Sequence, residues 1–150
     1  MLGIHVATAR GLQPVADVGA LAELPAGAVW IDLQNPTPDE EALVERWLEI
    51  DVPSREEMSE IEISSRLYEE DGALFMTVAS LLKADTVNPM LTDVTFILVG
   101  KRLVTVRYAE PLPISAYLQR APKIGPACQS GEVVLLGLIG AIIDRVADVL

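Results

Sequence analysis

Two adjacent carboxylates, Glu56 and Glu57, are the residues of this sequence whose types and spacing best suit binding of a hard cation. Mg²⁺ prefers oxygen ligands and commonly takes one or two protein carboxylates while it keeps several waters. The pair also fits a structural role, because Ser54 stands three residues before Glu57 and acids are favoured in the first turn of a helix. A helix N-terminus repels a cation, so a metal site here needs further acid from another chain or element. The spacing leaves both interpretations open.

The pair belongs to an acidic run from Asp39 to Asp71, which holds 13 acids and three bases. This run carries −10 of the formal net charge of −11. Such a balance argues against nucleic acid or an anionic membrane surface as a partner, because both need clustered Lys and Arg. Cations or basic partners suit the charge better, although surface acids are more often only a solvated face.

Other catalytic patterns are weak. Asp32 stands at the end of a predicted strand and is a candidate catalytic carboxylate, but an Asp there more often ends the strand or bonds the following turn. Cys128 and His5 are the only cysteine and histidine, so no internal disulfide or usual zinc cluster can form, and the two lie in no recognisable nucleophilic motif. No phosphate-binding loop or Gly-x-Ser-x-Gly elbow occurs. We therefore predict that the chain is not an enzyme.

The acidic pair is positioned by a short helix predicted from Arg55 to about Glu60, and a longer helix precedes it. The longer helix opens with Thr37 as N-cap, Pro38 at the first helical position and Glu40 closing a capping box. Two strands come before it. One lies in LGIHVATARGLQPV and ends near Gly11, and the other lies in GAVWIDLQ and stops at Asn35-Pro36.

Two hairpins and two helices follow the acidic pair. Asp71-Gly72 is a tight-turn dipeptide between two runs of strand formers, and a second hairpin turns at Gly100-Lys101. In its first strand one face carries Thr92, Val94, Phe96 and Leu98, and the other carries Leu91, Asp93, Thr95, Ile97 and Val99. A short helix in PLPISAYLQRAP and a loop in KIGPACQSG lead to a long final helix, which Ser130 caps and which runs to Leu150.

This order of elements predicts one domain over residues 1–150, of the α/β (α+β) class, with a mixed sheet sandwiched between helices. Half of the residues, 51%, are hydrophobic, which suits a folded domain with a real core. The longest apolar run, Val133 to Ile143, is shorter than the roughly 20 residues of a membrane span, and no signal peptide is visible.

Four segments of the chain resemble the CorA family of divalent-cation transporters. They are VWIDLQNPTPDE, VPSREEMSEIEISSRLYEEDGALFMTV, VTFILVGKRLVTVR and LLGLIGAIIDRVADVL. They follow one another in the family's order with fitting gaps and cover nearly all of residues 28–150. The resemblance implies the family fold, a mixed sheet between helices, followed by a long stalk helix and two membrane helices with a Gly-Met-Asn signature. It also implies a homopentamer that carries Mg²⁺, and often Co²⁺ or Ni²⁺, across a membrane.

The resemblance also assigns residues. The family's acidic pair falls on Glu56 and Glu57, where the family often has Glu-Asp, and Asp144 adds acid from the final helix. In the family, regulatory Mg²⁺ bound between cytoplasmic domains at this pair holds the pore closed. The stalk, the signature and the membrane helices are not among these 150 residues, so we expect that they do not conduct ions alone and form a monomer or weak oligomer in solution.

The resemblance therefore implies the cytoplasmic ion-sensing and gating domain of a divalent-cation channel, at the cytoplasmic face of the inner membrane. Two alternatives stay open. One is a zinc-transporting relative with the same fold. The other is a free-standing soluble interaction domain, although the final helix shows no stop signal of the kind a complete domain normally has.

Overall fold

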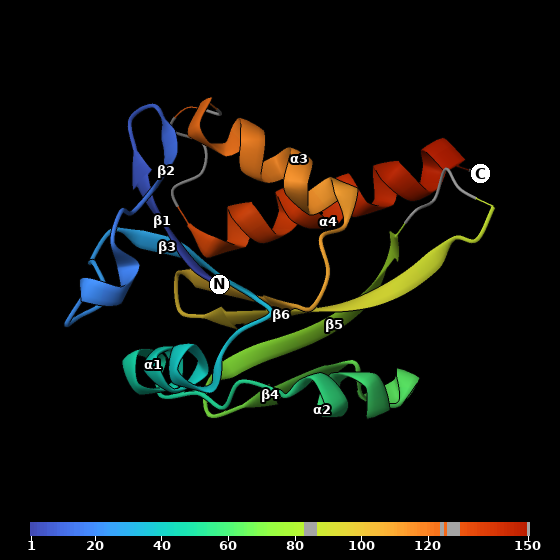
Figure 1. Cartoon of the computed structure of the whole chain (residues 1–150), viewed down its shortest axis with the longest axis horizontal. Helices are drawn as coiled ribbons and strands as arrows, with labels where there is room; N and C mark the ends of the chain where they lie inside the picture. Colours follow the sequence, from blue (N-terminus) through green and yellow to red (C-terminus); the bar gives the residue numbers. More distant parts are fainter. Residues whose placement is uncertain (83–86, 124, 126–129, 150) are drawn as a thin grey trace.

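The computed structural model describes residues 1–82, 87–123, 125 and 130–149 and shows one sheet between two helical layers (Figure 1). The sheet has seven strands in the order β2-β1-β3-β7-β6-β5-β4. The strands are β1 (Leu2–Thr8), β2 (Gly11–Pro14), β3 (Ala28–Gln34), β4 (Leu67–Glu70), β5 (Ala73–Leu82), β6 (Met90–Val99) and β7 (Arg102–Arg107). Only the central β3 and β7 are parallel neighbours, and all other pairs are antiparallel. The predicted mixed sheet between helices is confirmed.

The helices cover both faces of the sheet (Figure 1). They are α1 (Pro38–Leu48) and α2 (Arg55–Glu60) on one face, and α3 (Leu112–Arg120) and α4 (Gly131–Val149) on the other. Three short 3₁₀ turns occupy Val18–Ala20, Ile63–Ser65 and Ala121–Lys123. Each face has its own apolar core, so the sheet is buried on both sides.

Local sequence signals explain where the helices begin. Both capping boxes form: the side chain of Thr37 accepts from the backbone N–H of Glu40, and that of Ser54 accepts from the backbone N–H of Glu57. At the start of α4 the Ser130 hydroxyl accepts from the backbone N–H of Val133 at 3.4 Å. These three predicted helix starts are confirmed.

The two predicted hairpins are confirmed as well. Asp71 and Gly72 both have positive φ, at 51° and 76°, as a two-residue turn between β4 and β5 requires. The alternation along β6 also holds, because Val94 and Phe96 pack under α3 and α4 while Ile97 packs under α1 and α2. Most of the predicted loop KIGPACQSG, including Cys128, lies outside the described residues.

The N-terminal strand differs from its prediction, because the chain reverses at Arg10 and returns as β2. The hydroxyl of Thr8 donates to the carbonyl oxygen of Gly11 at 2.7 Å and stabilises this turn. Gly11 has φ 140°, and a Cβ there would lie 2.5 Å from the carbonyl oxygen of Ala121. The glycine that seemed to end one strand therefore begins the next, because only glycine fits against Ala121.

The position of Asp32 also differs from its prediction at a strand end. It lies inside β3, which continues to Gln34, and only 3% of it is exposed. Its Oδ2 accepts from Nη2 of the fully buried Arg107 at 2.7 Å, and its Oδ1 accepts from the hydroxyl of Thr105 at 2.7 Å. Asp32 thus neither ends a strand nor bonds the following turn through these contacts. It joins the two parallel central strands through a buried ion pair.

His5 lies beside this pair and stacks on Trp30 with ring centroids 4.7 Å apart. Burial lowers the pKa of His5, and the charge of Asp32 opposes that shift only in part. The imidazole is therefore neutral at neutral pH and packs as a core side chain.

Candidate cation site

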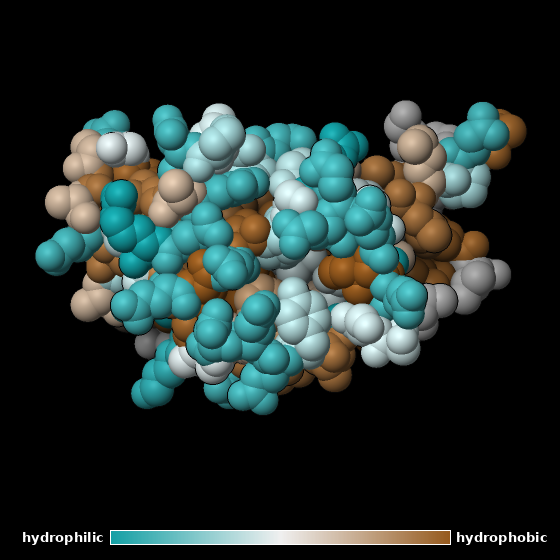
Figure 2. Space-filling view, turned by 90° about the horizontal axis from the view of Figure 1, so that it is seen from below, coloured by the Kyte–Doolittle hydropathy of each residue, from teal (hydrophilic) through white to brown (hydrophobic). Residues whose placement is uncertain are grey.

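The acidic run forms one side of the molecule, built from α1, α2, β4 and their connections. Figure 2 views the molecule from that side, and hydrophilic residues spread over much of its surface. Among the described residues, Glu40 is the one acid of the run that forms an ion pair, at 3.1 Å from the N-terminal ammonium. The other acids of this face have no base within ion-pair distance in that part of the chain, so the face keeps a strongly negative potential.

Glu56 and Glu57 both lie exposed on α2, which the buried Met58 anchors to the core. Glu57 has the predicted capping role, because its Oε1 accepts from the backbone N–H of Ser54 at 3.1 Å. The carboxylate of Glu56 takes no part in that cap. The structure thus confirms that Glu57 caps the helix. The second carboxylate oxygen of Glu57 and both carboxylate oxygens of Glu56 take no part in the capping box.

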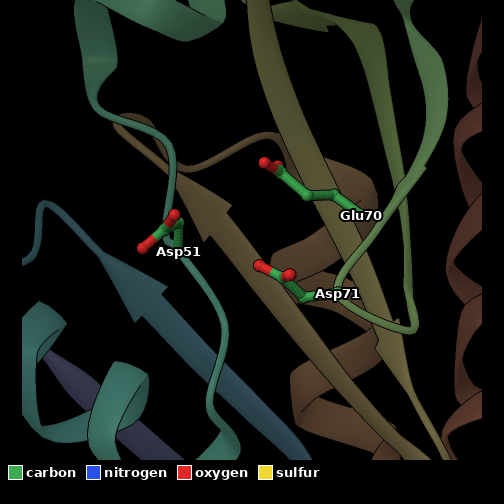
Figure 3. Close-up of side chains that lie close together, drawn as sticks. All are labelled: Asp51, Glu70 and Asp71. Carbon is green, nitrogen blue, oxygen red and sulfur yellow. The ribbon is translucent and has the colours of Figure 1, made fainter.

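Glu57 also lines an acidic hollow of about 330 Å³ between α1, α2 and β4. Glu45, Asp51 and Glu70 line the same hollow. Carboxylate oxygens of Asp51, Glu70 and the adjacent Asp71 lie within 4.8 Å of one another (Figure 3). Sequence reasoning missed this group, because Asp51 follows α1 whereas Glu70 ends β4 and Asp71 begins the turn after it. The acidic turn at Glu70-Asp71 was the only available signal.

Burial and the surrounding charges shift several pKa values on this face. Burial raises the pKa of Glu41, a hydrogen bond from the Tyr108 hydroxyl opposes the shift, and the charges of Glu45, Glu56 and Glu57 raise it further. Burial raises the pKa of Tyr68, and the charges of Glu70 and Glu57 add to the shift. The carboxylates around Glu41 and Tyr68 therefore oppose the ionisation of these two groups, and a bound cation would offset that effect.

We expect the Glu41 carboxyl to titrate above the usual range of glutamates, and the double substitution Glu56→Gln with Glu57→Gln to lower its pKa. The folded-state pKa of Glu41 lies above the unfolded value. Its contribution to stability is therefore fully present below the unfolded pKa and is lost as the pH rises through the folded pKa. Carbon-detected NMR titration of the glutamate carboxyls measures both pKa values.

Glu60→Gln is the matched control, since it removes one charge from the same helix and Glu60 is not among the groups that raise the Glu41 pKa. A Glu41 pKa that moves as much in Glu60→Gln as in the double variant would contradict this prediction.

Asp144 lies apart from the acidic pair. It is exposed on α4, across the sheet from α2, and lines a shallow hollow between α3 and α4 with Arg120 and Asp148. Within one chain the structure therefore brings Glu57 together with Asp51 and Glu70 but not with Asp144. The donors on the acidic face are all carboxylate oxygens, which fit a hard cation such as Mg²⁺.

Comparison with known proteins decides the family. A family model described as CorA-like Mg²⁺ transporter protein matches residues 25–150. This chain belongs to the CorA-like family. The resemblance inferred from four segments over residues 28–150 is thereby confirmed.

Curated relatives of this CorA-like chain are longer than it is. The magnesium transport protein CorA of Wolinella succinogenes is 28% identical over 132 residues, which cover 83% of this chain and 40% of the relative. The magnesium transport protein CorA of Escherichia coli K12 is 30% identical over 121 residues, which cover 81% of this chain and 38% of the relative. The chain thus spans about 40% of the length of these relatives.

Solved structures share the fold of this CorA-like chain. The soluble domain of CorA from Methanocaldococcus jannaschii matches with a TM-score of 0.69 and 12% identity, over 96% of this chain and 56% of that chain. The ZntB cytoplasmic domain from Vibrio parahaemolyticus matches with a TM-score of 0.61 and 16% identity, over 97% of this chain and 60% of that chain. In the described part of the chain, none of the helices has the length and hydropathy of a membrane-spanning segment.

Proposed function

We propose that this chain is the ion-sensing and gating domain of a CorA-like transporter of divalent cations. The observation that carries the proposal is the family match over residues 25–150, with curated relatives named magnesium transport proteins. Mg²⁺, and also Co²⁺ or Ni²⁺, is the proposed cargo of the whole transporter. The chain itself performs no catalysis and lies at the cytoplasmic face of the cell membrane, attached through membrane helices that the longer polypeptide supplies.

Glu56 and Glu57 are the proposed sensing residues, and regulatory Mg²⁺ is their ligand. Both carboxylates are exposed on a face whose acids are mostly unpaired among the described residues. When this face meets a neighbouring subunit that also contributes acid, the carboxylates repel one another. A bridging Mg²⁺ reverses the sign of that interaction and stabilises the closed arrangement, so binding of the ion and subunit arrangement are linked.

The position of Asp144 fits this proposal if the subunits form a ring, as in the proposed homopentamer. A ring is built from heterologous contacts, in which one face of each subunit meets a different face of the next. Glu56 and Asp144 lie on opposite sides of the sheet. A heterologous contact is therefore able to bring Asp144 of one subunit to the acidic pair of its neighbour.

Neutralising Glu56 and Glu57 together in the whole transporter is expected to raise the cytosolic Mg²⁺ concentration that half-inhibits transport about tenfold. A tenfold change corresponds to about 1.4 kcal/mol of lost binding free energy. The measurement is Mg²⁺ uptake into vesicles loaded with a series of internal Mg²⁺ concentrations, for the variant Glu56→Gln with Glu57→Gln. Glu60→Gln is the control for charge alone, and unchanged inhibition in the double variant would overturn the sensing role.

Zinc transport is the second candidate, because the ZntB cytoplasmic domain has the same fold. At 16% identity this similarity supports the fold and not the ion. Uptake of Zn²⁺ and Mg²⁺ by the same vesicles separates the two candidates. Zn²⁺ uptake without Mg²⁺ uptake would favour zinc transport.

A further inference from the structure

A hollow of about 490 Å³ lies at the end of the sheet where the parallel strands β3 and β7 begin. It is lined by Ala7 of β1, by residues 26–29 at the start of β3, and by Lys101 and Arg102 at the start of β7. Figure 1 shows this end of the sheet at the left, where the first turn of α4 also lies. The volume falls within the range of small-molecule sites, about 300–1,000 Å³. We name this cavity the basic hollow.

The charges in the basic hollow are positive, although the chain as a whole has a net charge of −11. Among the described residues, Lys101 and Arg102 are the charged side chains of its lining, and no acid lines it. The hollows that contain Glu57 and Asp144 are both lined by several acids. In the part of the chain that the structure describes, neither Lys101 nor Arg102 has a carboxylate within ion-pair distance. Both positive charges are therefore available to an anion.

Arg102 is held in place at the wall of the basic hollow. Its Nε donates to the carbonyl oxygen of Ala28 at 3.1 Å, and the side chain is half-buried. Its Nη1 and Nη2 have no hydrogen-bond partner among the described residues. A guanidinium presents its N–H groups as a planar fork, which matches two oxygens of a phosphate or carboxylate. Because the contact with Ala28 already orients the side chain, less rotamer freedom is lost when an anion binds.

The start of α4 adds to the positive potential beside the basic hollow. The backbone N–H of Gly131 donates to the carbonyl oxygen of Lys101 at 2.7 Å, so the first turn of this 19-residue helix lies against Lys101. A helix N-terminus carries a partial positive charge and favours anions near it. Glu132 in that turn is exposed and does not line the hollow. Two side chains and a helix end therefore favour an anion at the same place.

Small residues on the β3 side leave the basic hollow open. Gly27 is not among the residues with positive φ, and a Cβ there would lie 3.9 Å from the Cβ of Val6, an ordinary van der Waals contact. Neither the backbone nor the packing of the described residues therefore requires glycine at this position. A larger side chain at a residue that lines the hollow would reduce its volume. Gly27, with Ala26 and Ala28, leaves space for more than the charged group of a ligand.

Phosphate fits these groups better than carboxylate does. A phosphate monoester carries about −1.5 to −2 charges at pH 7 and three strong acceptor oxygens, so it can contact the Arg102 fork and the Lys101 ammonium together. A carboxylate has one charge and two oxygens, which Arg102 alone satisfies. We propose that the basic hollow binds a small phosphate-bearing organic molecule, with its phosphate on Arg102 and Lys101 and the rest of the molecule along residues 26–28. The proposal requires neither Glu56 nor Glu57, so it stands or fails independently of the ion-sensing role.

Equilibrium dialysis of the whole transporter in uncharged lipid tests the proposal, with radiolabelled ribose 5-phosphate as the probe. Divalent cations are removed, so that no metal ion can hold the phosphate at the acidic face. Lys101→Gln with Arg102→Gln is expected to weaken binding about tenfold or more, which corresponds to about 1.4 kcal/mol. Arg46→Gln with Lys123→Gln is the matched control, because it removes the same charge from exposed residues that do not line the hollow. This control is expected to change the affinity by less than about twofold.

Gly27→Leu tests the hollow itself without a change of charge. It is expected to weaken binding of ribose 5-phosphate about tenfold, because the added side chain takes up part of the space that the ligand needs. Circular dichroism before dialysis establishes that each variant is folded.

Inorganic phosphate and ribose separate the two parts of the ligand. Inorganic phosphate is expected to bind about tenfold more weakly than ribose 5-phosphate, and ribose is expected not to compete with either. Equal affinity for inorganic phosphate and ribose 5-phosphate would overturn the assignment to an organic molecule. The site would be overturned if neither phosphate binds, if Lys101→Gln with Arg102→Gln or Gly27→Leu leaves the affinity unchanged, or if the charge control weakens binding as much.

Discussion

Replacement of Arg107 by methionine is expected to lower the free energy of unfolding by about 3–5 kcal/mol. Arg107 is fully buried, and its guanidinium donates to both carboxylate oxygens of Asp32. Methionine fills similar space but leaves the Asp32 carboxylate buried without its cation, and an unpaired buried charge is costly. Urea unfolding at neutral pH, followed by circular dichroism, measures the loss.

Arg66→Met is the matched control, because Arg66 forms its ion pair with Asp93 at a similar distance, 3.1 Å, but with about a quarter of each side chain exposed. Exposed pairs contribute at most about 1 kcal/mol. The double variant Asp32→Leu with Arg107→Met removes both charges and should regain part of the loss. A loss of unfolding free energy in Arg107→Met no larger than that in Arg66→Met would contradict this prediction.

Substitution of Gly131 by alanine has the second largest expected effect, a loss of about 1–3 kcal/mol. A Cβ at Gly131 would lie 2.5 Å from the backbone carbon of Arg102 and 2.5 Å from the backbone nitrogen of Leu103. No rotamer change relieves a clash with backbone, and the N–H of Gly131 is fixed to the carbonyl oxygen of Lys101 at 2.7 Å. The start of α4 must therefore move away from β7, and thermal or urea unfolding measures the cost.

Gly140→Ala in the same helix is the control with the opposite expected sign. No atom of the described residues would lie within 4 Å of its Cβ, so the gain in helix propensity is expected to raise the stability of this chain by about 0.5–1 kcal/mol. Equal effects of the two substitutions would show that the backbone contact at Gly131 does not limit the packing.

The two faces of the sheet carry different parts of the proposed function. The acidic face over α1 and α2 holds Glu56 and Glu57, the proposed sensing residues. The other face is covered by α3 and α4, and it carries the exposed Asp144.

Features that depend on near neighbours along the chain could be predicted from the amino-acid sequence. The capping boxes at Thr37 and Ser54 fixed the starts of α1 and α2, because a cap needs only residues within one helical turn. Asp71-Gly72 fixed a hairpin for the same reason. The four family segments were recognisable because their residues and order are linear properties, and they predicted the fold class and the family correctly.

Features that join distant segments became visible only in the folded chain. Asp32 and Arg107 meet across 75 positions because β3 and β7 are parallel neighbours, and no local pattern near either residue specifies that pairing. No local pattern specifies that Asp51 lies beside Glu70 and Asp71. Nor does one specify that Asp144 and Glu56 lie on opposite sides of the sheet. Residue types state what a side chain is able to bind. Which side chains meet depends on strand order and on the face that each helix covers, and these are set by the packing of the whole chain.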